Sequence, residues 1–502
     1  MAQSIGIDFG TAYLTAALWT ADGPRTLARM PAVARMLHGG GALCGEEAHA
    51  ARSAYALSTI DRIKRFLGRT REEVRDAARQ VAWNLEPDPA APEGFQVDAW
   101  TGRFAPEAVA AELLRELARR AREALGQDLR GAVLTIPAAA TNRQRLALKH
   151  AASLAGLSVL RIVNEPAALA IAEAHAEPVA WGEQRWAVLS FGAGMTDAAV
   201  VRVGRDGVAV EAAAGDTGLG LGEIREKLIA KLETLFSRRH GVPVDRTRPE
   251  VRAELTWLGE ELLQALCEKR SHRVDLKGAA CGRDGAPLDL NEVLTRHDLK
   301  LAARAPARRL LELADRALRQ AGCPKGRIHR VILAGGGAFV PALREAVQDF
   351  FRKAPAQRKG RAPHERPAHG AALLAASLDG RVDLRLQDVL ARSLGIALVH
   401  DRFSVVLPAG QPLPARQARC YTTVEDNQRF IKFEVREGEE PAASRNALLG
   451  QFHLAGLRLA PAGVPNVEVA FRIDESGILD VEAVDVDTRA RQRVQIERAR
   501  SA

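Results

Sequence analysis

Two short stretches of this chain combine glycine turns with carboxylates, the groups that bind phosphate and magnesium. Residues 5–18 read IGIDFGTAYLTAAL, and residues 186–201 read WAVLSFGAGMTDAAVV. Each pattern predicts a buried strand, a glycine turn and a returning strand. Such turns can point successive backbone N–H groups into a concave nest, which binds phosphate oxygens without charged side chains. Two nests facing each other would hold a polyphosphate.

The carboxylates beside these turns suit a magnesium ion. Asp8 ends the first strand, and Asp197 lies just beyond the second turn. Mg²⁺ keeps several waters and takes few protein ligands, so a carboxylate at a strand end can hold its hydration shell. When the two stretches are aligned, Asp8 falls on Ser190, so the second copy has lost a carboxylate. One such turn alone is typical of an ordinary hairpin, but the duplication favours a phosphate site.

Two further segments could complete this site. Residues 331–337 read VILAGGG, an apolar strand followed by three glycines that would let a flat purine or ribose approach the backbone. Residues 162–168 read IVNEPAA, in which Glu165 precedes a helix predicted to begin at Pro166. Glu165 is either a site carboxylate or a helix-capping acid, because acidic side chains are stabilising at helix N-termini.

The order of strands and helices indicates how these segments are positioned. Residues 5–157 and 186–376 each open with a glycine-turn hairpin and continue into long amphipathic helices such as 106–125. We interpret this as an internal duplication of α/β units. From about residue 383 short alternating runs such as 467–473 predict a β domain. Few residues follow the last predicted strand near 494–496, so we expect no helical domain after it.

Composition limits the classes of protein and partner. A chain of 502 residues with 47% hydrophobic content can fill two or three cores. The net charge is +9, but the basic residues are dispersed and no aromatic residues interleave them, which does not favour nucleic-acid binding. No apolar stretch is long enough to predict a membrane span or a signal peptide. We therefore expect a cytoplasmic location and no membrane partner.

These motifs resemble a known family. The actin-like ATPase fold presents the same order of segments as IGIDFGT, IVNEPAALA, GAGMTD, GDTGLG and VILAGGG. The β domain, with SLGIAL, VEDNQ, LGQF and VEVAFRIDESGIL, is similar to the peptide-binding sandwich of the heat shock protein 70 (DnaK-type) chaperones. The resemblance covers nearly the whole chain, from Ile5 to about Ile496. It implies a duplicated two-lobe α/β actin-like nucleotide-binding domain over 1–382, a linker over 383–388, and an all-β substrate-binding sandwich over 389–502 without a helical lid.

The resemblance also implies residue roles. Lys64 matches the family's catalytic lysine, and Asp8, Glu165 and Asp197 match carboxylates of its magnesium site. Contacts to ATP or ADP are implied for Gly10, Thr11, Ala12, Gly192, Ala193, Gly194, Gly215, Glu260, Leu263, Gln264, Cys267, Gly335, Gly336, Gly337 and Phe339. Interdomain signalling is implied for Pro137 and Arg145.

A peptide cleft in the β domain is implied for Ile396, Val399, Tyr421, Val424, Ile431 and Phe433. Their types fit this role, since apolar side chains alternating along strands make pockets for an extended peptide. The competing interpretation is that Ile431 and Phe433 fill the core of the sandwich, because inward alternation is what any β-sandwich shows.

The departures from the family pattern collect around the nucleotide site. Ser190 replaces an aspartate that orients water, and Met195 replaces a threonine of the second loop. Leu263, Gln264 and Cys267 replace two basic residues and a serine on the helix that would cover adenosine. Phe339 replaces an arginine that stacks on adenine, and His364 replaces a carboxylate. Core packing can explain single changes but not their collection at one site.

Two functions follow from this pattern. The first is a chaperone with a weak, Mg-dependent ATPase that binds extended apolar polypeptides, together with a J-domain co-chaperone and a nucleotide exchange factor. The second is a pseudo-ATPase, a nucleotide sensor or scaffold whose β domain docks one dedicated client. A sugar kinase or a filament protein of the same ATPase fold would leave the β domain unexplained.

Overall fold

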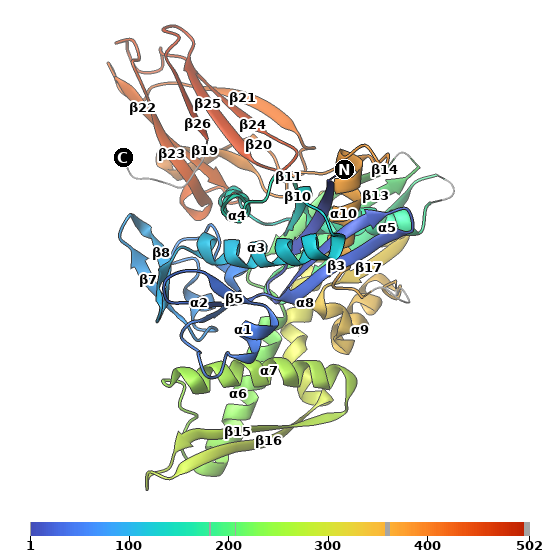
Figure 1. Ribbon diagram of the computed structural model, residues 1–502. Helices are drawn as coiled ribbons and strands as arrows, with labels where there is room; N and C mark the ends of the chain where they lie inside the picture. Colours follow the sequence, from blue (N-terminus) through green and yellow to red (C-terminus); the bar gives the residue numbers. More distant parts are fainter. Residues whose placement is uncertain (1, 180–181, 206, 357–361, 496–502) are drawn as a thin grey trace.

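The protein consists of two α/β lobes and a β-sandwich, as Figure 1 shows. A computed structural model describes residues 2–179, 182–205, 207–356 and 362–495. The sandwich, in orange and red, lies against the end of the first lobe, while residues 221–295 of the second lobe lie at the opposite end.

The first lobe is built on a five-stranded sheet of order β11-β10-β1-β2-β3. Its strands are β1 (Gln3–Phe9), β2 (Tyr13–Thr20), β3 (Gly23–Pro31), β10 (Leu129–Ile136) and β11 (Val159–Asn164). β1, β2 and β3 form an antiparallel meander, and β10 and β11 run parallel to β1. β1 and β2 are buried along most of their length, as expected for strands covered on both faces.

The second lobe repeats this plan with the order β17-β12-β13-β14-β18. Its strands are β12 (Gln184–Phe191), β13 (Thr196–Gly204), β14 (Gly207–Asp216), β17 (Arg330–Ala334) and β18 (Leu386–Gln387). β12, β13 and β14 form the second meander, and β17 is parallel to β12. The duplication predicted from the two hairpins is therefore confirmed.

Two helices form the boundary between the lobes, α5 (Glu165–Ala176) and α10 (Arg366–Leu378). α10 packs on β1 and β2 of the first sheet, and α5 packs on strands of the second. Their backbones approach closely, because a Cβ at Gly370 would lie 1.8 Å from the Ala168 carbonyl oxygen. A Cβ at Gly6 would likewise lie 2.1 Å from the Ala372 nitrogen. The segment carrying Glu165 is thus held between the two sheets.

The other helices cover the outer faces or form insertions. α3 (Pro106–Leu125), at the predicted bounds, and α4 (Asn142–Leu154) cover the first sheet. α8 (Arg296–Gln320) packs on β13 and β14 of the second sheet, and α9 (Pro341–Phe351) packs against α8. The first-lobe insertion contains β4 (Val33–Met36), β5 (Ala42–Cys44), β6 (Thr59–Asp61), β7 (Asn84–Asp88), β8 (Ala91–Ala99), β9 (Gly102–Phe104), α1 (Glu46–Ala50) and α2 (Arg75–Ala78). The second-lobe insertion contains α6 (Leu221–His240), α7 (Pro249–Glu268), β15 (Ser271–Cys281) and β16 (Pro287–Thr295).

The C-terminal part is a sandwich of two antiparallel four-stranded sheets. One contains β19 (Leu394–Leu398), β20 (Arg402–Leu407), β22 (Phe430–Glu437) and β23 (Ala447–Ala455). The other contains β21 (Ala415–Tyr421), β24 (Val467–Ile473), β25 (Leu479–Asp485) and β26 (Arg491–Gln495). Ile496, where the last strand was predicted to end, lies outside the described residues.

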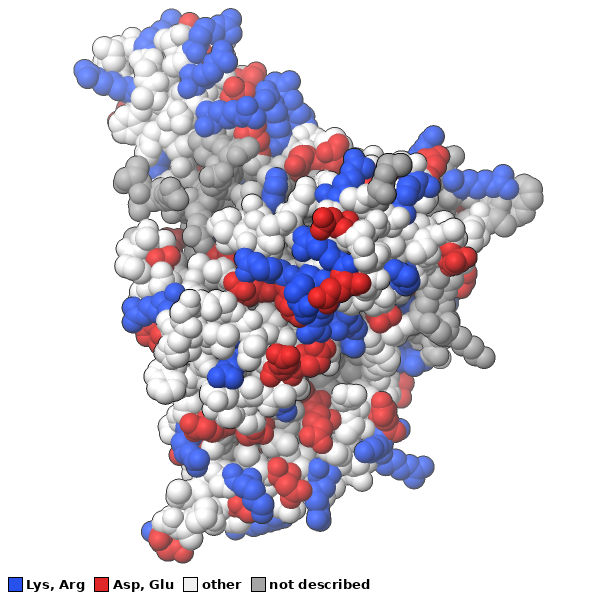
Figure 2. All heavy atoms as spheres, in the orientation of Figure 1, with Lys and Arg blue, Asp and Glu red and all other residues white. Residues whose placement is uncertain are grey.

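The surface agrees with the dispersed charge of the sequence. Figure 2 shows Lys and Arg interspersed with Asp and Glu over one face. Within the described residues, no helix is both long and apolar enough to cross a membrane.

Candidate nucleotide site and interdomain contacts

The predicted lysine and carboxylates meet between the two lobes. Asp8 ends β1, and Asp197 lies at the start of β13, where it pairs in register with Ser190 of β12. Glu165 is the first residue of α5, and Lys64 lies in a 3₁₀ turn, Ile63–Arg65. The Lys64 Nζ donates to Glu165 Oε1 at 2.8 Å, and the Ser190 hydroxyl donates to Glu165 Oε2 at 3.3 Å. Five residues from distant parts of the chain thus form one cluster.

Two further groups hold the aspartates in place. The Thr135 hydroxyl of β10 donates to Asp8 Oδ1 at 2.5 Å. The Ala139 N–H donates to Asp197 Oδ1 at 3.4 Å. A Cβ at Gly215 would lie 2.3 Å from Asp197 Oδ1, so this first glycine of GDTGLG leaves room for the carboxylate.

The cluster carries more negative than positive charge. Burial, and next the Glu165 carboxylate, raise the pKa of Asp8 to about 6, against the opposing effects of Lys64 and Thr135. Burial and Glu165 also raise the pKa of Asp197 to about 8. Burial alone would lower the pKa of Lys64, but the Glu165 and Asp8 carboxylates outweigh it, so that this pKa is raised. Three carboxylates share one lysine, so the donor set suits an additional cation.

The two glycine turns lie side by side at this cluster. A Cβ at Gly194 would lie 3.2 Å from Thr11 Cγ2 of the first turn and 2.8 Å from Arg65 Cδ. The first turn is held at Ala12, whose carbonyl accepts from the Ala32 N–H at 2.8 Å. The second turn is held by the start of α6, because the Gly192 and Ala193 carbonyls accept from the N–H groups of residues 221 and 222. Gly10 is required sterically, since its Cβ would lie 2.3 Å from the Tyr13 carbonyl oxygen.

Arg65 brings a cation to these turns and forms no ion pair with any residue that the structure describes. Its side chain is buried, one guanidinium nitrogen donates to Gln80 at 2.7 Å, and Nε has no partner. Burial, and next the nearby Arg62 and Arg69, lower the pKa of Arg65 to about 10. The cationic side chain of Arg65 therefore suits the negative charge of a phosphate chain.

The third glycine segment lies next to the second turn. Gly335 has φ +75, and a Cβ there would lie 2.5 Å from the Phe191 carbonyl oxygen. Cβ atoms at Gly336 and Gly337 would meet Leu221 and Phe191 at 2.5 Å. These glycines therefore permit close packing onto β12 and α6, a role that is separate from the predicted approach of a purine.

Phe339 and His364 lie together beside this segment. Their ring centroids are 5.9 Å apart, and Phe339 is 47% exposed. Burial and Arg29 lower the pKa of His364 to about 4, so its imidazole is neutral at pH 7. The pair offers a neutral, partly exposed aromatic surface where the family pattern has charged side chains.

The predicted adenosine-covering residues of α7 have different environments. Leu263 is buried in the core of the second lobe, which agrees with the packing explanation of this residue. Gln264 is exposed and Cys267 is half-buried. Glu260 is engaged by two cations, Arg62 of the first lobe at 2.5 Å and Arg225 of α6 at 3.2 Å.

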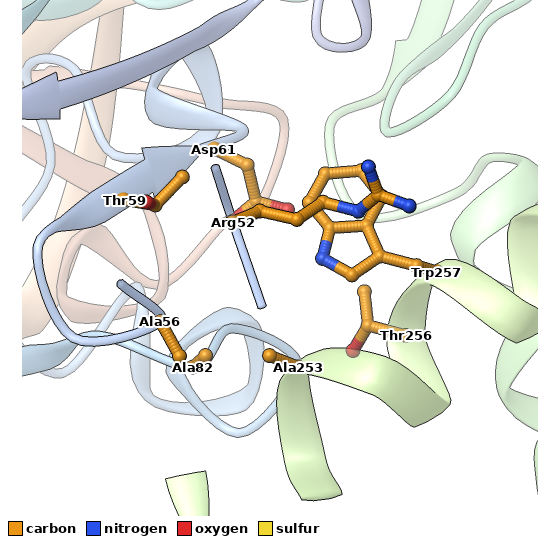
Figure 3. A pocket seen from close by; sticks show the side chains of 8 residues that line it. All are labelled: Arg52, Ala56, Thr59, Asp61, Ala82, Ala253, Thr256 and Trp257. Carbon is orange, nitrogen blue, oxygen red and sulfur yellow. The ribbon is translucent and has the colours of Figure 1, made fainter. Parts of the chain in front are cut away.

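Arg62 is part of a seam that joins the two insertions across the cleft. At this seam the Arg52 side chain lies over the Trp257 ring (Figure 3), with its guanidinium carbon 4.6 Å from the ring centroid. Arg252 donates to the Ala82 carbonyl at 2.6 Å, and Ser53 donates to Glu254. The cavity left between these groups is about 10 Å³, close to the space of one water molecule. The cleft is therefore closed at this end.

Arg145 connects the first lobe to the sandwich. It lies on α4, follows the buried Pro137, and donates to Asn164 Oδ1 at 2.6 Å and to the Ser476 carbonyl at 3.1 Å. The Ser476 hydroxyl also accepts from the Ile162 N–H at 3.1 Å. Because Asn164 directly precedes Glu165, these bonds run from the β24–β25 turn to the lysine–carboxylate cluster.

The segment between the domains is itself ordered as β18. Leu386 and Gln387 pair in parallel with Val208 and Ala209 of β14. A Cβ at Gly207 would lie 2.3 Å from the Arg385 carbonyl oxygen, so this glycine allows the approach. Arg385 and Gln387 interrupt the leucines of the linker, yet the strand still pairs, because parallel pairing uses the backbone.

The predicted peptide-cleft residues divide into two groups. Ile396, Ile431 and Phe433 are buried in the sandwich core, at 1%, 9% and 2% exposure. Val399 and Val424 are 48% and 59% exposed. Tyr421 lies between the groups: its hydroxyl is 3.1 Å from Ser404 Oγ and its ring centroid is 6.1 Å from that of Phe433.

Several residues of the site were not predicted from the sequence. Arg65 follows Lys64 directly, so a cation next to the predicted lysine was the available signal. Ser476 lies in the turn between β24 and β25, and nothing in the residues of that turn indicates contact with another domain. Arg62 has φ 55 and ψ 23, a left-handed conformation that no local pattern predicts.

Comparison with known proteins agrees with this geometry. A model of the Hsp70 protein family matches residues 4–502. The chain is 33% identical to the Chaperone protein DnaK of Thermus thermophilus over 504 residues, covering 99% of this chain and 81% of the relative. It is 32% identical to the Chaperone protein dnaK1 of Prochlorococcus marinus, covering 99% and 75%. The chain belongs to the Hsp70 family and is a chaperone of the Hsp70 type.

Proposed function

We propose that this chaperone binds Mg-ATP between its lobes, hydrolyses it slowly, and uses the nucleotide to control polypeptide binding by the sandwich. The observation that supports this most directly is the cluster of Lys64, Glu165, Asp8 and Asp197 beside two facing glycine turns. A bound cation would compensate the excess of carboxylates, and phosphate oxygens would compensate the positive charge of Arg65. ADP would be the product retained in the same cleft.

Magnesium fits the carboxylate side of this site. Asp8, Glu165 and Asp197 would hold the ion through its waters, since Mg²⁺ dehydrates reluctantly. Among the described residues no three Asp, Glu, His or Cys side chains converge closely enough to ligate a metal directly. When bound, the ion neutralises charge on the transferring phosphate.

The protein's own groups have separate tasks in this proposal. The backbone N–H groups of the two turns orient the phosphate chain, and Arg65 neutralises part of its charge. Lys64, held by Glu165, stabilises the charge that develops on the transferred phosphate and helps to position the attacking water. Ser190 can hydrogen-bond a water but cannot accept its proton as a carboxylate does, which makes hydrolysis slow.

Nucleotide control would act through Arg145. A change at Glu165 is transmitted to the neighbouring Asn164, then to Arg145, and then to the turn at Ser476. Interdomain control requires two arrangements of this contact, and the Arg145–Ser476 bond belongs to the docked one. A J-domain co-chaperone and a nucleotide exchange factor are the expected partners of such a cycle.

The test is a thermal-shift titration with Mg-ATP, followed by measurement of phosphate release. We expect saturable stabilisation and a slow release of phosphate, both reduced in Lys64→Met. Stabilisation without any phosphate release would show that the protein binds the nucleotide without hydrolysing it, and would favour the sensor or scaffold alternative. Absence of stabilisation at millimolar Mg-ATP would contradict the nucleotide proposal as a whole.

We further propose that extended apolar polypeptides bind the sandwich at Val399 and Val424. Their exposure supports this, because an apolar side chain at a protein surface is available to a ligand. Ile396, Ile431 and Phe433 would then form the wall behind the bound segment, and Tyr421 its edge.

A fluorescent Leu-rich peptide and the full chain provide the test, with binding followed by anisotropy. Val424→Ser should weaken binding by about five-fold, since about 1 kcal/mol of apolar contact is lost. Val486→Ser, at another partly exposed valine of the sandwich, is the matched control. Ile431→Phe should mainly lower the melting temperature, because overpacking a core typically costs about 1 to 3 kcal/mol. Equal affinity of Val424→Ser and the control would contradict the assignment.

A further inference from the structure

A groove rich in arginine lies beside the interlobe seam, and no residue of the two glycine turns lines it. Its volume is about 820 Å³, and its lining includes Arg71, Arg75, Arg79 and Arg252 together with Glu72 and Glu93. We call it the arginine groove. Four guanidinium groups against two carboxylates leave a surplus of positive charge in a concave site.

Both lobes contribute to this groove. Arg71, Arg75 and Arg79 belong to the first lobe, in and around α2, and their spacing of four places such side chains on one side of a helical segment. Arg252 comes from α7 of the second lobe and reaches across to the Ala82 carbonyl. The groove is thus continuous with the seam in Figure 3, which includes Ala82 and the neighbouring Ala253.

The charge of the groove is poorly compensated within the protein. Among residues 2–179, 182–205, 207–356 and 362–495, neither Arg71 nor Arg252 forms an ion pair. The Arg252 Nε is buried without a hydrogen-bond partner. Arg75 pairs with Glu72 at 3.1 Å and Arg79 with Asp76 at 3.5 Å, both through exposed side chains. Exposed pairs of this kind contribute little, so these arginines are available to a ligand.

We propose that the arginine groove binds a small anion that carries several phosphate groups. Guanidinium groups bind phosphate oxygens through paired, charge-assisted hydrogen bonds, and a groove of this size is typical of small-ligand sites. The aromatic residue of the lining, Trp83, is 2% exposed and donates its indole N–H to Asp61 at 3.2 Å. No stacking surface for a nucleobase is present in this lining, so recognition rests on phosphate charge.

A ligand in this groove would join the two lobes. Arg252 would share the anion with arginines of the first lobe, and the seam beside it would open less often. The proposal is independent of nucleotide hydrolysis, because the groove uses none of the lysine–carboxylate cluster or the glycine turns.

The test measures the binding of sodium tripolyphosphate to the full chain by isothermal titration calorimetry at low ionic strength. The double variant Arg71→Gln/Arg79→Gln should bind about 10- to 100-fold more weakly, since two charge-assisted contacts are removed. Arg103→Gln, an exposed arginine of β9 outside the groove, is the control and should bind as the unaltered chain does. Melting temperatures identify any variant that has lost its fold.

Binding at the nucleotide site must be distinguished from binding in the groove. If tripolyphosphate occupies the glycine turns, Lys64→Gln will lose affinity and the double variant will not, and the proposal is then wrong. Equal affinity of the double variant and Arg103→Gln also overturns it. Hydrogen exchange gives a second readout: tripolyphosphate should slow exchange of residues 249–257 in the unaltered chain but not in the double variant. Binding without such protection overturns the bridging role.

Discussion

Ser190 lies where the crowding of carboxylates is greatest. It is 3% exposed, pairs in register with Asp197, and donates to Glu165. A serine at this position limits the negative charge of a site in which two aspartates already have raised pKa values. If the protein hydrolyses ATP as proposed, we expect this serine to favour the stability of the nucleotide-free protein at the expense of water activation.

Ser190→Asp should therefore have opposite effects on catalysis and on stability. With Mg-ATP bound, we expect the single-turnover hydrolysis rate to rise about tenfold, below the usual ~10²–10⁴ for proton-transfer groups, because Phe339 and His364 remain altered. Without nucleotide, the melting temperature should fall, since a fourth carboxylate enters the cluster. Ser190→Asn is the control, because the asparagine side chain has the shape of aspartate without its charge, and it should show neither effect. An unchanged rate in a variant that binds Mg-ATP would place the defect elsewhere.

The raised pKa of Asp197 predicts a pH dependence of the nucleotide-free protein. Its folded pKa is about 8 and its ordinary value is 3.8, so between these values the folded state holds a proton that the unfolded state has released. Stability should therefore fall as pH rises from about 4 to about 8, by at most about 1.4 kcal/mol per pH unit for this group. Asp8 adds to this fall up to about pH 6.

Asp197→Asn isolates this contribution. An amide cannot ionise, so the variant should gain stability relative to the unaltered chain between pH 5 and pH 7.5, measured by urea denaturation. Asp349→Asn, at an exposed position of α9, should leave the pH dependence unchanged. Parallel stability curves for Asp197→Asn and the unaltered chain would show that Asp197 is ionised in the folded state.

Among the elements, β18 is the one whose placement connects the domains. It is two residues long, so its pairing with β14 depends on close backbone approach at Gly207. Gly207 has φ +129, and the Arg385 carbonyl occupies the space that a side chain would need. The β14 edge is thus shaped to receive the linker.

Gly207→Ala should release this linker. A methyl group there would clash with the Arg385 carbonyl at 2.3 Å, so trypsin should cleave after Arg385 faster than in the unaltered chain. Gly241→Ala is the matched control: Gly241 has φ +72 but open space around its Cβ position, so it carries backbone strain without the clash. Equal cleavage of both variants would indicate that β18 does not depend on Gly207.

Over the whole molecule, the two insertions form a closing contact distinct from the nucleotide cluster. Three arginines make this contact. Arg62 pairs with Glu260, Arg52 lies over the Trp257 ring, and Arg252 donates to the Ala82 carbonyl. If nucleotide binds between the lobes as proposed, we expect the seam, which closes one end of the cleft, to limit nucleotide release.

Arg62→Met should speed that release. The variant removes the ion pair with Glu260 but leaves Arg225 beside that carboxylate, so we expect a loss of about 1 kcal/mol, equivalent to about five-fold faster ADP release. Stopped-flow release of a fluorescent ADP measures this, with Arg103→Met as the control. A release rate equal to that of the control would show that the seam opens independently of Arg62.

The sequence by itself determined the local features of this protein. Apolar runs ending in glycine turns predicted the two hairpins, because buried strands and tight glycine turns have residue requirements that are visible locally. The same holds for α3, whose apolar periodicity and N-terminal proline predicted its bounds. Resemblance then identified Lys64, Glu165 and Asp197 as members of one site, and the Lys64–Glu165 contact agrees with that grouping.

Only the tertiary structure decided which distant groups meet. Glu260 binds Arg62 from almost 200 positions earlier, and Arg145 reaches Ser476 more than 300 positions later. Such contacts depend on how packed elements present their surfaces, and a single charged residue carries no local mark of its partner. The division of the predicted cleft residues was decided in the same way: Phe433 is buried on β22, whereas Val424 is exposed in the loop between β21 and β22, and the residue types alone do not reveal which of them the sandwich covers.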